Sequence, residues 1–263
     1  MIDVNASLGR WPFRRLRYAT PPAMLRQMDQ LAIERACVAP IEALLYLDVQ
    51  EANREMARAI RRHRDRLLFF PSINPAWPDW QTDLDECIEK LGATGVRLFP
   101  SYHNYRINDR PCLELLAELE RRDLPVQIAT VVADPRMHHP AVMVPAVRLD
   151  PLADLLRLFP RLRFAILNAT GIRETVNPKT LGRTDNLFFD VAFADGVACV
   201  DDLIDVMGRG RVLLGTNAPM MIGLGAVYKL RESRIEAGEL RRLLRENALR
   251  FLSRRGKGDG GRP

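Results

Sequence analysis

The sequence predicts one α/β domain, a (β/α)8 barrel of the TIM type in a regular or distorted form. Three observations support this fold class. The chain has 263 residues, which suits one barrel of this kind. Short β-rich runs alternate with stretches of helical periodicity along its length. No linker or shift in composition divides the chain before its last residues.

Eight short apolar runs, rich in β-branched and aromatic residues, are the candidate strands. They are MIDV (1–4), RACVAP (35–40), LLFFPSI (67–73), TGVRLF (94–99), PVQIATV (125–131), RFAILN (163–168), LFFDVA (187–192) and RVLLGT (211–216). Strands that alternate with helices need right-handed crossover connections and therefore form a parallel sheet. Eight such units in roughly 250 residues favour a closed barrel.

Amphipathic stretches separate these strands. PPAMLRQMDQLA begins with prolines, which a first helical turn tolerates. Apolar residues recur at helical spacing in VQEANREMARAIRRHR, in the stretch from Leu84 to Leu91 and in the stretch from Leu113 to Leu119. The last predicted helix is GELRRLLRENALRFLSRR (238–255).

The type of sheet and the boundary of the domain remain to be assigned. A doubly wound open sheet would also alternate strands with helices, but no Gly-rich turn follows the first strand to support dinucleotide binding. We assign residues 1–252 to the barrel and SRRGKGDGGRP (253–263) to a disordered basic tail.

Composition and charge narrow the class of partner. Hydrophobic residues make up 47% and charged residues 27% of the chain, as in ordinary globular proteins. The formal net charge is +6 and the sequence pI is about 9.4. Because the basic residues are dispersed and no nucleic-acid motif accompanies them, we expect no nucleic-acid partner. An anionic small molecule is compatible with this charge.

The cysteines and the amino terminus point to the cytoplasm. Cys37, Cys87, Cys112 and Cys199 are scattered without metal-ligand spacing, which is typical of buried thiols in a reducing compartment. We expect neither a signal peptide nor a membrane partner, because no apolar run is long enough to cross a bilayer.

Polar side chains gather where the predicted strands end, which is where barrels of this type place their functional groups. These candidates are Asn5, Ser7, Glu42, Asn74, Arg97, Tyr102, His103, Gln127, Asp134, Arg136, His138, His139, Asn168, Asp190 and Asn217. Four of them are asparagines, which makes a polar but uncharged lining. That is unusual for a metal site, since carboxylate, imidazole and thiolate groups supply the usual ligands.

Several segments together resemble one family. They are MIDVNASLG at the amino terminus, SINPAWPDWQTDLDE (72–86), GVRLFPSYHNYRINDRP (95–111), LLGTNAPMM (213–221) and RENALRFL (245–252). In this order they resemble the amidohydrolase superfamily, in particular its amidohydrolase-related branch of decarboxylases and lactonases. The resemblance spans nearly the whole chain and implies a barrel with hydrolase or lyase chemistry.

The metal-binding positions depart from that family. The resemblance implies a His-x-His pair at the first strand, where Asn5 and Ser7 stand. It implies histidines at the fifth and sixth strands, at Ala129 and Ala169, and an aspartate at Asn217. Alanine has no donor atom and a neutral amide is no general base near pH 7. The resemblance therefore implies a divergent member that has lost the metal ligands, and we expect no metal and no other cofactor.

Arginine candidates carry two interpretations each. Arg97 lies inside an apolar strand, so its guanidinium needs either a bound anion or a buried partner such as Glu42 or Asp190. Arg136 could clamp a substrate carboxylate, but an ion pair with Asp134 is the interpretation we favour.

Acid–base candidates are His103, His139 and Asp190. Burial of Asp190 beside apolar side chains would raise its pKa and suit it to proton transfer, whereas a purely structural role would have it accept backbone hydrogen bonds. The adjacent pair His138–His139 would supply a relocated metal site or an acid–base pair if the loop made the two rings converge. The interpretation we favour has one ring exposed and the other hydrogen-bonded across the barrel mouth.

Three classes of function remain open at this stage. The first is a metal-independent hydrolase or lyase acting on a small carboxylate-bearing molecule, with Asn5, Ser7, Glu42, Asn74, Arg97, Tyr102, Gln127, Arg136, Asn168 and Asn217 binding the substrate. The second is a pseudoenzyme that binds a ligand or partner without turnover. The third is a metal hydrolase with relocated ligands. The resemblance is also compatible with a homodimer.

Overall fold

A computed structural model describes residues 1–46, 48–170 and 184–254. Eight strands run parallel in chain order, in one sheet of three and one of five. They are β1 (Ile2–Leu8), β2 (Arg35–Pro40), β3 (Leu67–Phe69), β4 (Val96–Leu98), β5 (Val126–Ala129), β6 (Phe164–Leu167), β7 (Leu187–Asp190) and β8 (Val212–Leu213). Each lies within or over one of the eight predicted runs.

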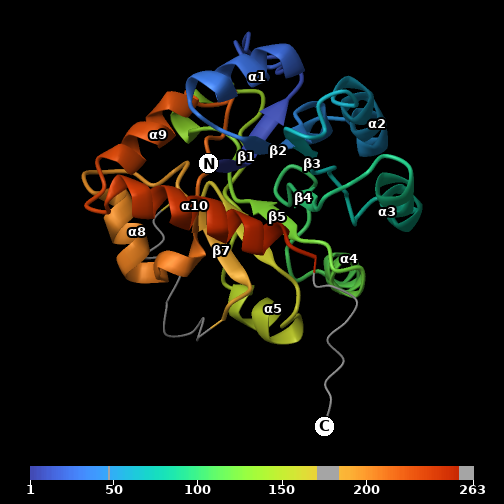
Figure 1. The fold of residues 1–263 in the computed structure, drawn as a ribbon. Coiled ribbons are helices and arrows are strands. Elements are labelled where there is room, and N and C mark those ends of the chain that lie inside the picture. Colours follow the sequence, from blue (N-terminus) through green and yellow to red (C-terminus); the bar gives the residue numbers. More distant parts are fainter. Residues whose placement is uncertain (47, 171–183, 255–263) are drawn as a thin grey trace.

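Backbone hydrogen bonds join the two sheets at both seams. Val4 N donates to Leu214 O at 2.9 Å, which brings β1 beside β8. Arg97 N donates to Pro71 O at 2.9 Å, which brings β4 beside the end of β3. The eight strands therefore close on themselves, with the helices arranged around them (Figure 1). The predicted (β/α)8 barrel is confirmed.

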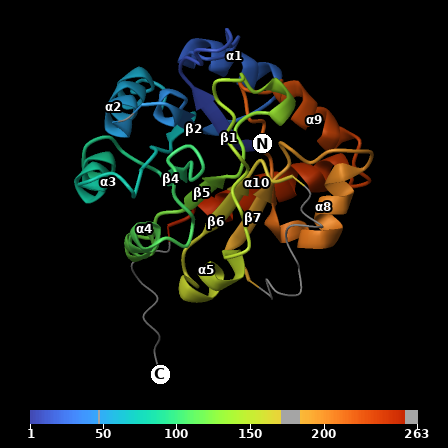
Figure 2. The same cartoon turned by 180° about the vertical axis from the view of Figure 1, so that it is seen from behind.

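The helices surround the barrel and cover its outer face in both views (Figures 1 and 2). They are α1 (Pro21–Gln30), α2 (Val49–Ala59), α3 (Trp80–Glu89), α4 (Arg110–Arg121), α5 (Leu152–Leu158), α8 (Cys199–Met207), α9 (Gly223–Arg231) and α10 (Ala237–Leu252), with short 3-10 turns η1 (Glu42–Leu44), η2 (Pro135–Met137) and η3 (Arg209–Arg211). None of the helices in the described ranges is long and apolar enough to cross a membrane.

Helix α10 closes the amino end of the barrel. Its Ala248 and Phe251 are buried in one cluster with inward-facing strand residues such as Ile2, Val4 and Phe188. The helix lies across the strands in Figure 1. Because this end is filled by apolar side chains, polar chemistry is left to the carboxyl ends of the strands.

Strand β1 is longer than predicted and contains a bulge. Its pairing with β2 shifts register between Asp3 and Ala6, where β1 contains one more residue than the paired stretch of β2. Side chains of a regular strand alternate between two faces, so Val4 and Asn5 would point to opposite sides. The bulge lets Val4 join the interior cluster while Asn5 and Ser7 line a pocket at the carboxyl end.

The predicted disordered tail, 253–263, lies outside the described residues except for Ser253 and Arg254. Ser253 N donates to Leu249 O at 2.7 Å and so ends α10. The assignment of residues 1–252 to one barrel domain stays a prediction.

Gly95, just before β4, tests the packing of the interior. A Cβ at this position would lie 2.3 Å from the Phe70 ring and 2.7 Å from Pro125 O. We expect Gly95→Ala to lower the free energy of unfolding by about 1–3 kcal/mol, because the overpacked ring and backbone must move. Chemical denaturation measures this change. Gly225→Ala in α9, where a Cβ meets nothing within 4 Å, is the control, and it should stabilise by about 0.5–1 kcal/mol. Equal effects of the two substitutions would contradict the packing described here.

Candidate functional site

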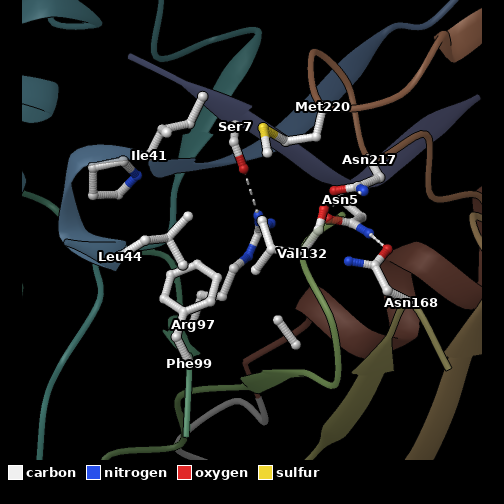
Figure 3. Close-up of a pocket in the computed structure, with 12 residues that line it drawn as sticks. Asn5, Ser7, Ile41, Leu44, Arg97, Phe99, Val132, Asn168, Asn217 and Met220 are labelled. Carbon is white, nitrogen blue, oxygen red and sulfur yellow. Dashed lines mark hydrogen bonds between the residues drawn. The ribbon is translucent and has the colours of Figure 1, made fainter. Parts of the chain in front are cut away.

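A pocket lies at the carboxyl ends of the strands (Figure 3). Its volume is about 290 Å³ when the space at its opening to solvent is included. Asn5 and Ser7 from β1 and Arg97 from β4 form its polar side together with two further asparagines that follow β6 and β8. The full lining is Asn5, Ser7, Pro40, Ile41, Leu44, Arg97, Phe99, Ala129, Val132, Asn168, Asn217 and Met220. Its lining therefore contains both polar and apolar side chains.

The apolar side belongs to a cluster of buried residues that we call the mouth cluster. It consists of Ala39, Ile41, Leu44, Phe99, Ala129, Val132, Ala133 and Met220. Trp11, Leu16 and Tyr102 pack against this cluster from the loops after β1 and β4. These residues place a hydrophobic layer over the polar side chains at the strand ends.

Arg97 is the charged group of the pocket, and only 1% of its surface is exposed. Its Nε donates to Gln127 Oε1 at 2.7 Å. Its two terminal nitrogens point to Ser7 Oγ (3.2 Å) and to the carbonyl oxygens of residues 4, 6 and 37 (3.2, 2.9 and 3.3 Å). Burial lowers the pKa of Arg97 to about 10, so the guanidinium stays charged at neutral pH.

The ion pair that was one of two alternatives for Arg97 is not formed with Glu42 or Asp190. Neither Glu42 nor Asp190 is among its hydrogen-bond partners, because neutral oxygens surround all of its nitrogens. Gln127, predicted as a substrate-binding residue, instead orients the guanidinium and donates its own Nε2 to Val4 O at 2.7 Å. The nearest acidic groups act on Arg97 only through space.

An amide–carboxylate network lies beside Arg97. Asn5 Nδ2 donates to Asn168 Oδ1 at 2.7 Å and to Asp190 Oδ2 at 2.6 Å. Asn168 N donates to the other Asp190 oxygen at 2.9 Å. Both oxygens of Asp190 are thus used in holding the two asparagines, and burial raises its pKa to about 6. Asp190 does not itself line the pocket.

Asp3 is a second buried carboxylate, which the sequence analysis missed. It accepts hydrogen bonds from Asn5 N (2.9 Å), Thr216 N (3.1 Å) and Thr216 Oγ1 (2.6 Å), and burial raises its pKa. It ties β1 to the segment after β8. A lone carboxylate within the apolar run MIDV was the available signal.

Asn168 and Asn217 turn the chain into the pocket. Both have positive φ, 60° and 50°, a left-handed conformation that asparagine tolerates better than most residues. Asn168 Nδ2 donates to Val131 O at 2.7 Å and Asn217 Nδ2 donates to Val132 O at 2.9 Å. The two side chains are therefore fixed to the loop after β5.

His103 and His139 lie outside the lining of this pocket. His103 Nε2 bonds to Ala43 O at 2.8 Å, and burial lowers the pKa of the ring, so it is neutral and carries its proton on Nε2. His139 is exposed, and its ring stacks on Phe13 with centroids 4.6 Å apart. His138 bonds to Ala133 O at 3.1 Å. The adjacent rings do not converge on a common site.

The other predicted substrate-binding residues have local partners. Arg136 is 84% exposed and pairs with Asp134 at 2.5 Å, and this arginine lowers the pKa of Asp134 to about 2. The favoured ion pair is therefore present. Glu42 accepts from Arg10 N at 2.6 Å, and Asn74 accepts from Ala76 N at 3.1 Å. Local backbone and side-chain donors occupy these groups, and they do not line the pocket.

Comparison with known proteins identifies the family. A family model described as amidohydrolase matches residues 4–254. The chain belongs to this amidohydrolase family. The expected family is thus confirmed. Solved structures that resemble this chain have the same barrel fold.

Three solved structures illustrate this similarity of fold. An uncharacterised TIM-barrel protein from Bordetella bronchiseptica has 18% identity and a TM-score of 0.72, covering 95% of this chain and 97% of that one. A 2,6-dihydroxybenzoate decarboxylase bound to 2,6-dihydroxybenzoate has 16% identity and a TM-score of 0.72, with coverage of 95% and 97%. A dihydroxybenzoic acid decarboxylase from Polaromonas sp. JS666, with manganese and 2-nitroresorcinol, has 14% identity and a TM-score of 0.76, with coverage of 95% and 96%.

The donor atoms of the pocket do not suit manganese or zinc. Its polar lining offers amides, a hydroxyl and a guanidinium, and its carboxylate neighbours are held by protein donors. Among residues 1–46, 48–170 and 184–254, no three His, Cys, Asp or Glu side chains come together as a metal site would require. The relocated metal site considered for His103, His138, His139 and Asp190 therefore has no counterpart in these parts of the chain.

Asp190→Asn tests the network through its pH dependence. The pKa of Asp190 is about 6 in the folded protein against an ordinary value of 3.8, so the folded state binds the extra proton between these values. Wild-type stability should therefore fall by on the order of 2–3 kcal/mol as pH rises from about 4 to 6. The variant should lack this share of the slope in urea unfolding. Asp150→Asn, at an exposed carboxylate whose pKa is lowered, should retain the slope. Parallel curves for wild type and Asp190→Asn would show that Asp190 is not the group involved.

Proposed function

We propose that the carboxyl end of this barrel binds a small organic acid with an apolar or aromatic body. Arg97 and Ser7 would face the carboxylate, and the mouth cluster would cover the rest of the molecule. The observation that carries the proposal is a charged guanidinium, 1% exposed, in a pocket whose other polar groups are neutral.

The charge of Arg97 favours an anion. A buried cation without a contacting carboxylate is costly, and a bound carboxylate would offset that cost. The contact from Arg97 to Ser7 Oγ is long, at 3.2 Å. A ligand oxygen could therefore share this nitrogen while the Ser7 hydroxyl turns to donate to it.

The apolar wall favours an acid with a hydrophobic body. Leu44, Phe99, Val132 and Met220 line the same pocket as the polar groups (Figure 3). Only about 10 Å³ of the space is wide enough for the centre of a water molecule, so a ligand must displace side chains. Met220 is suited to this because its unbranched side chain adapts to irregular shapes. Related decarboxylases bind a dihydroxybenzoate or a nitroresorcinol in the same fold.

The loop after β1 supports the proposal with positive charge at the mouth. Arg10, Arg15 and Arg17 are exposed there, and in the described chain none of them forms an ion pair. Arg14 donates to the carbonyl oxygen of Met220, a pocket residue. Such a loop would raise the local concentration of anions and speed their association.

Binding without turnover is the function that the geometry supports best. The pocket lining as described holds no imidazole or carboxylate that could move a proton. A metal-independent lyase or hydrolase is the second candidate, favoured by the Asp190 pKa of about 6 directly behind Asn5 and Asn168. Conversion of 2,6-dihydroxybenzoate to carbon dioxide and resorcinol, monitored by NMR, would favour an enzyme over a protein that binds without turnover. Cytoplasmic location and a homodimer stay predictions.

Replacement of Arg97 tests the binding of the acid. Titration calorimetry should detect 2,6-dihydroxybenzoate or benzoate on the wild type, and neutral benzamide should bind far more weakly. Arg97→Met should weaken acid binding by about 10- to 100-fold, the usual worth of a hydrogen bond to a charged group. Arg97→Lys, which keeps the charge, should lose less.

Arg163→Met is the matched control. Arg163 is also buried, but it donates to Asp123 O at 2.8 Å and to the carbonyl oxygen of Ser253, away from the pocket. This variant should bind the acid as the wild type does. Equal affinity for benzoate and benzamide, or unchanged acid binding in Arg97→Met, would refute the proposal.

The arginines of the loop after β1 should affect the rate at which 2,6-dihydroxybenzoate associates with the protein. We expect the triple change Arg10→Glu, Arg15→Glu and Arg17→Glu to slow association of 2,6-dihydroxybenzoate about 10-fold at low salt, with the difference shrinking at high salt. Stopped-flow tryptophan fluorescence measures this rate.

A control with the same charge change lies at the opposite end of the barrel. Arg58, Arg61 and Arg62 are exposed at and after the end of α2, where the chain leads into the amino end of β3. Their replacement by glutamate should leave the rate within about 2-fold of the wild-type value, given the screening length. If both triple variants slowed association equally, overall charge rather than the loop would control the rate.

A further inference from the structure

We infer that Arg97 is the resident cation of this barrel: its guanidinium fills an oxygen cage that would otherwise suit a bound cation, and the site takes up no divalent metal. The inference concerns the charge carried by the protein itself. It goes beyond the proposed ligand and does not depend on that ligand being a carboxylate.

Five neutral oxygen atoms converge on the guanidinium. They are Gln127 Oε1 at 2.7 Å, Ser7 Oγ at 3.2 Å and the carbonyl oxygens of Ala6, Val4 and Cys37 at 2.9, 3.2 and 3.3 Å. Carbonyl, amide and hydroxyl oxygens are also the ligands that hard cations take in proteins. Here strands β1, β2 and β5 turn those oxygens toward a side chain of β4.

The carboxylates that could attract a metal are turned to other donors. Asp190 accepts from Asn5 and Asn168, and Asp3 accepts from Thr216 and the Asn5 backbone. Neither side chain belongs to the lining of the pocket.

Electrostatics then exclude a second cation. The charge of the guanidinium would repel a divalent ion beside it, and this repulsion is strong in the interior because the effective dielectric constant is low. Neutral amides such as Asn5 and Asn217 cannot offset that repulsion. The related Polaromonas decarboxylase holds manganese, and this chain supplies a fixed organic cation instead.

Manganese binding and chemical rescue test the inference. Wild-type protein dialysed against 100 µM Mn²⁺ should retain less than a tenth of an equivalent by electron paramagnetic resonance, and Mn²⁺ should not raise its melting temperature. Arg97→Lys, which keeps a cation in the cage, should also remain free of metal. Retention of about one equivalent by the wild type would overturn the inference.

Arg97→Ala empties the cage and should be destabilised. Guanidinium chloride at 10 mM should raise the melting temperature of this variant, whereas the same concentration of sodium chloride should not, and wild type should respond to neither. Absence of rescue by guanidinium, or equal rescue by sodium chloride, would contradict the assignment of the cage. If Arg97→Ala does not fold, the metal measurements on wild type and Arg97→Lys still decide. Failure of 2,6-dihydroxybenzoate to bind would leave all these readouts unchanged.

Discussion

The satisfaction of one buried guanidinium constrains the whole carboxyl end of the barrel. Arg97 donates hydrogen bonds to β1, β2 and β5, so these strands must place their acceptor oxygens within reach of its nitrogens. An uncompensated charge in the interior would cost several kcal/mol, and a partly satisfied one would not be much better. The polar network and the apolar layer above it are therefore arranged around a side chain that has little freedom to move.

Two buried carboxylates complete this arrangement without contacting the cation. Asp190 fixes Asn5 and Asn168, and Asp3 fixes the backbone of β1 against Thr216. Gly215 is part of the same packing, because a Cβ there would lie 2.2 Å from Asp190 Oδ2. Positive and negative groups thus share the interior while neutral amides lie between them, and the guanidinium is the charged group in the lining of the pocket.

Much of the fold was readable from the sequence, and less of the site was. Strand and helix periodicity suffices to predict the barrel, and an arginine inside an apolar strand marks Arg97 as a site residue. Its real partners could not be foreseen, because most are backbone carbonyls that every residue carries. The placement of His139 on Phe13 depends on how two loops meet across the mouth, and the use of Glu42 depends on the backbone of Arg10. Such contacts between segments distant in sequence leave no periodic signal. Asp3 was missed for the opposite reason: it lies in a strand that reads as apolar core.

Because β1 contains a bulge, a regular strand cannot replace it without changing the site. One additional residue between Asp3 and Ala6 changes which face the following side chains occupy. A regular strand with the same sequence would turn Asn5 and Ser7 toward the surrounding helices and bring Ala6 into the barrel. Grafting this site onto another barrel would therefore require the irregular strand as well as the polar residues, and a comparison of strand ends that ignores the bulge would match the wrong side chains.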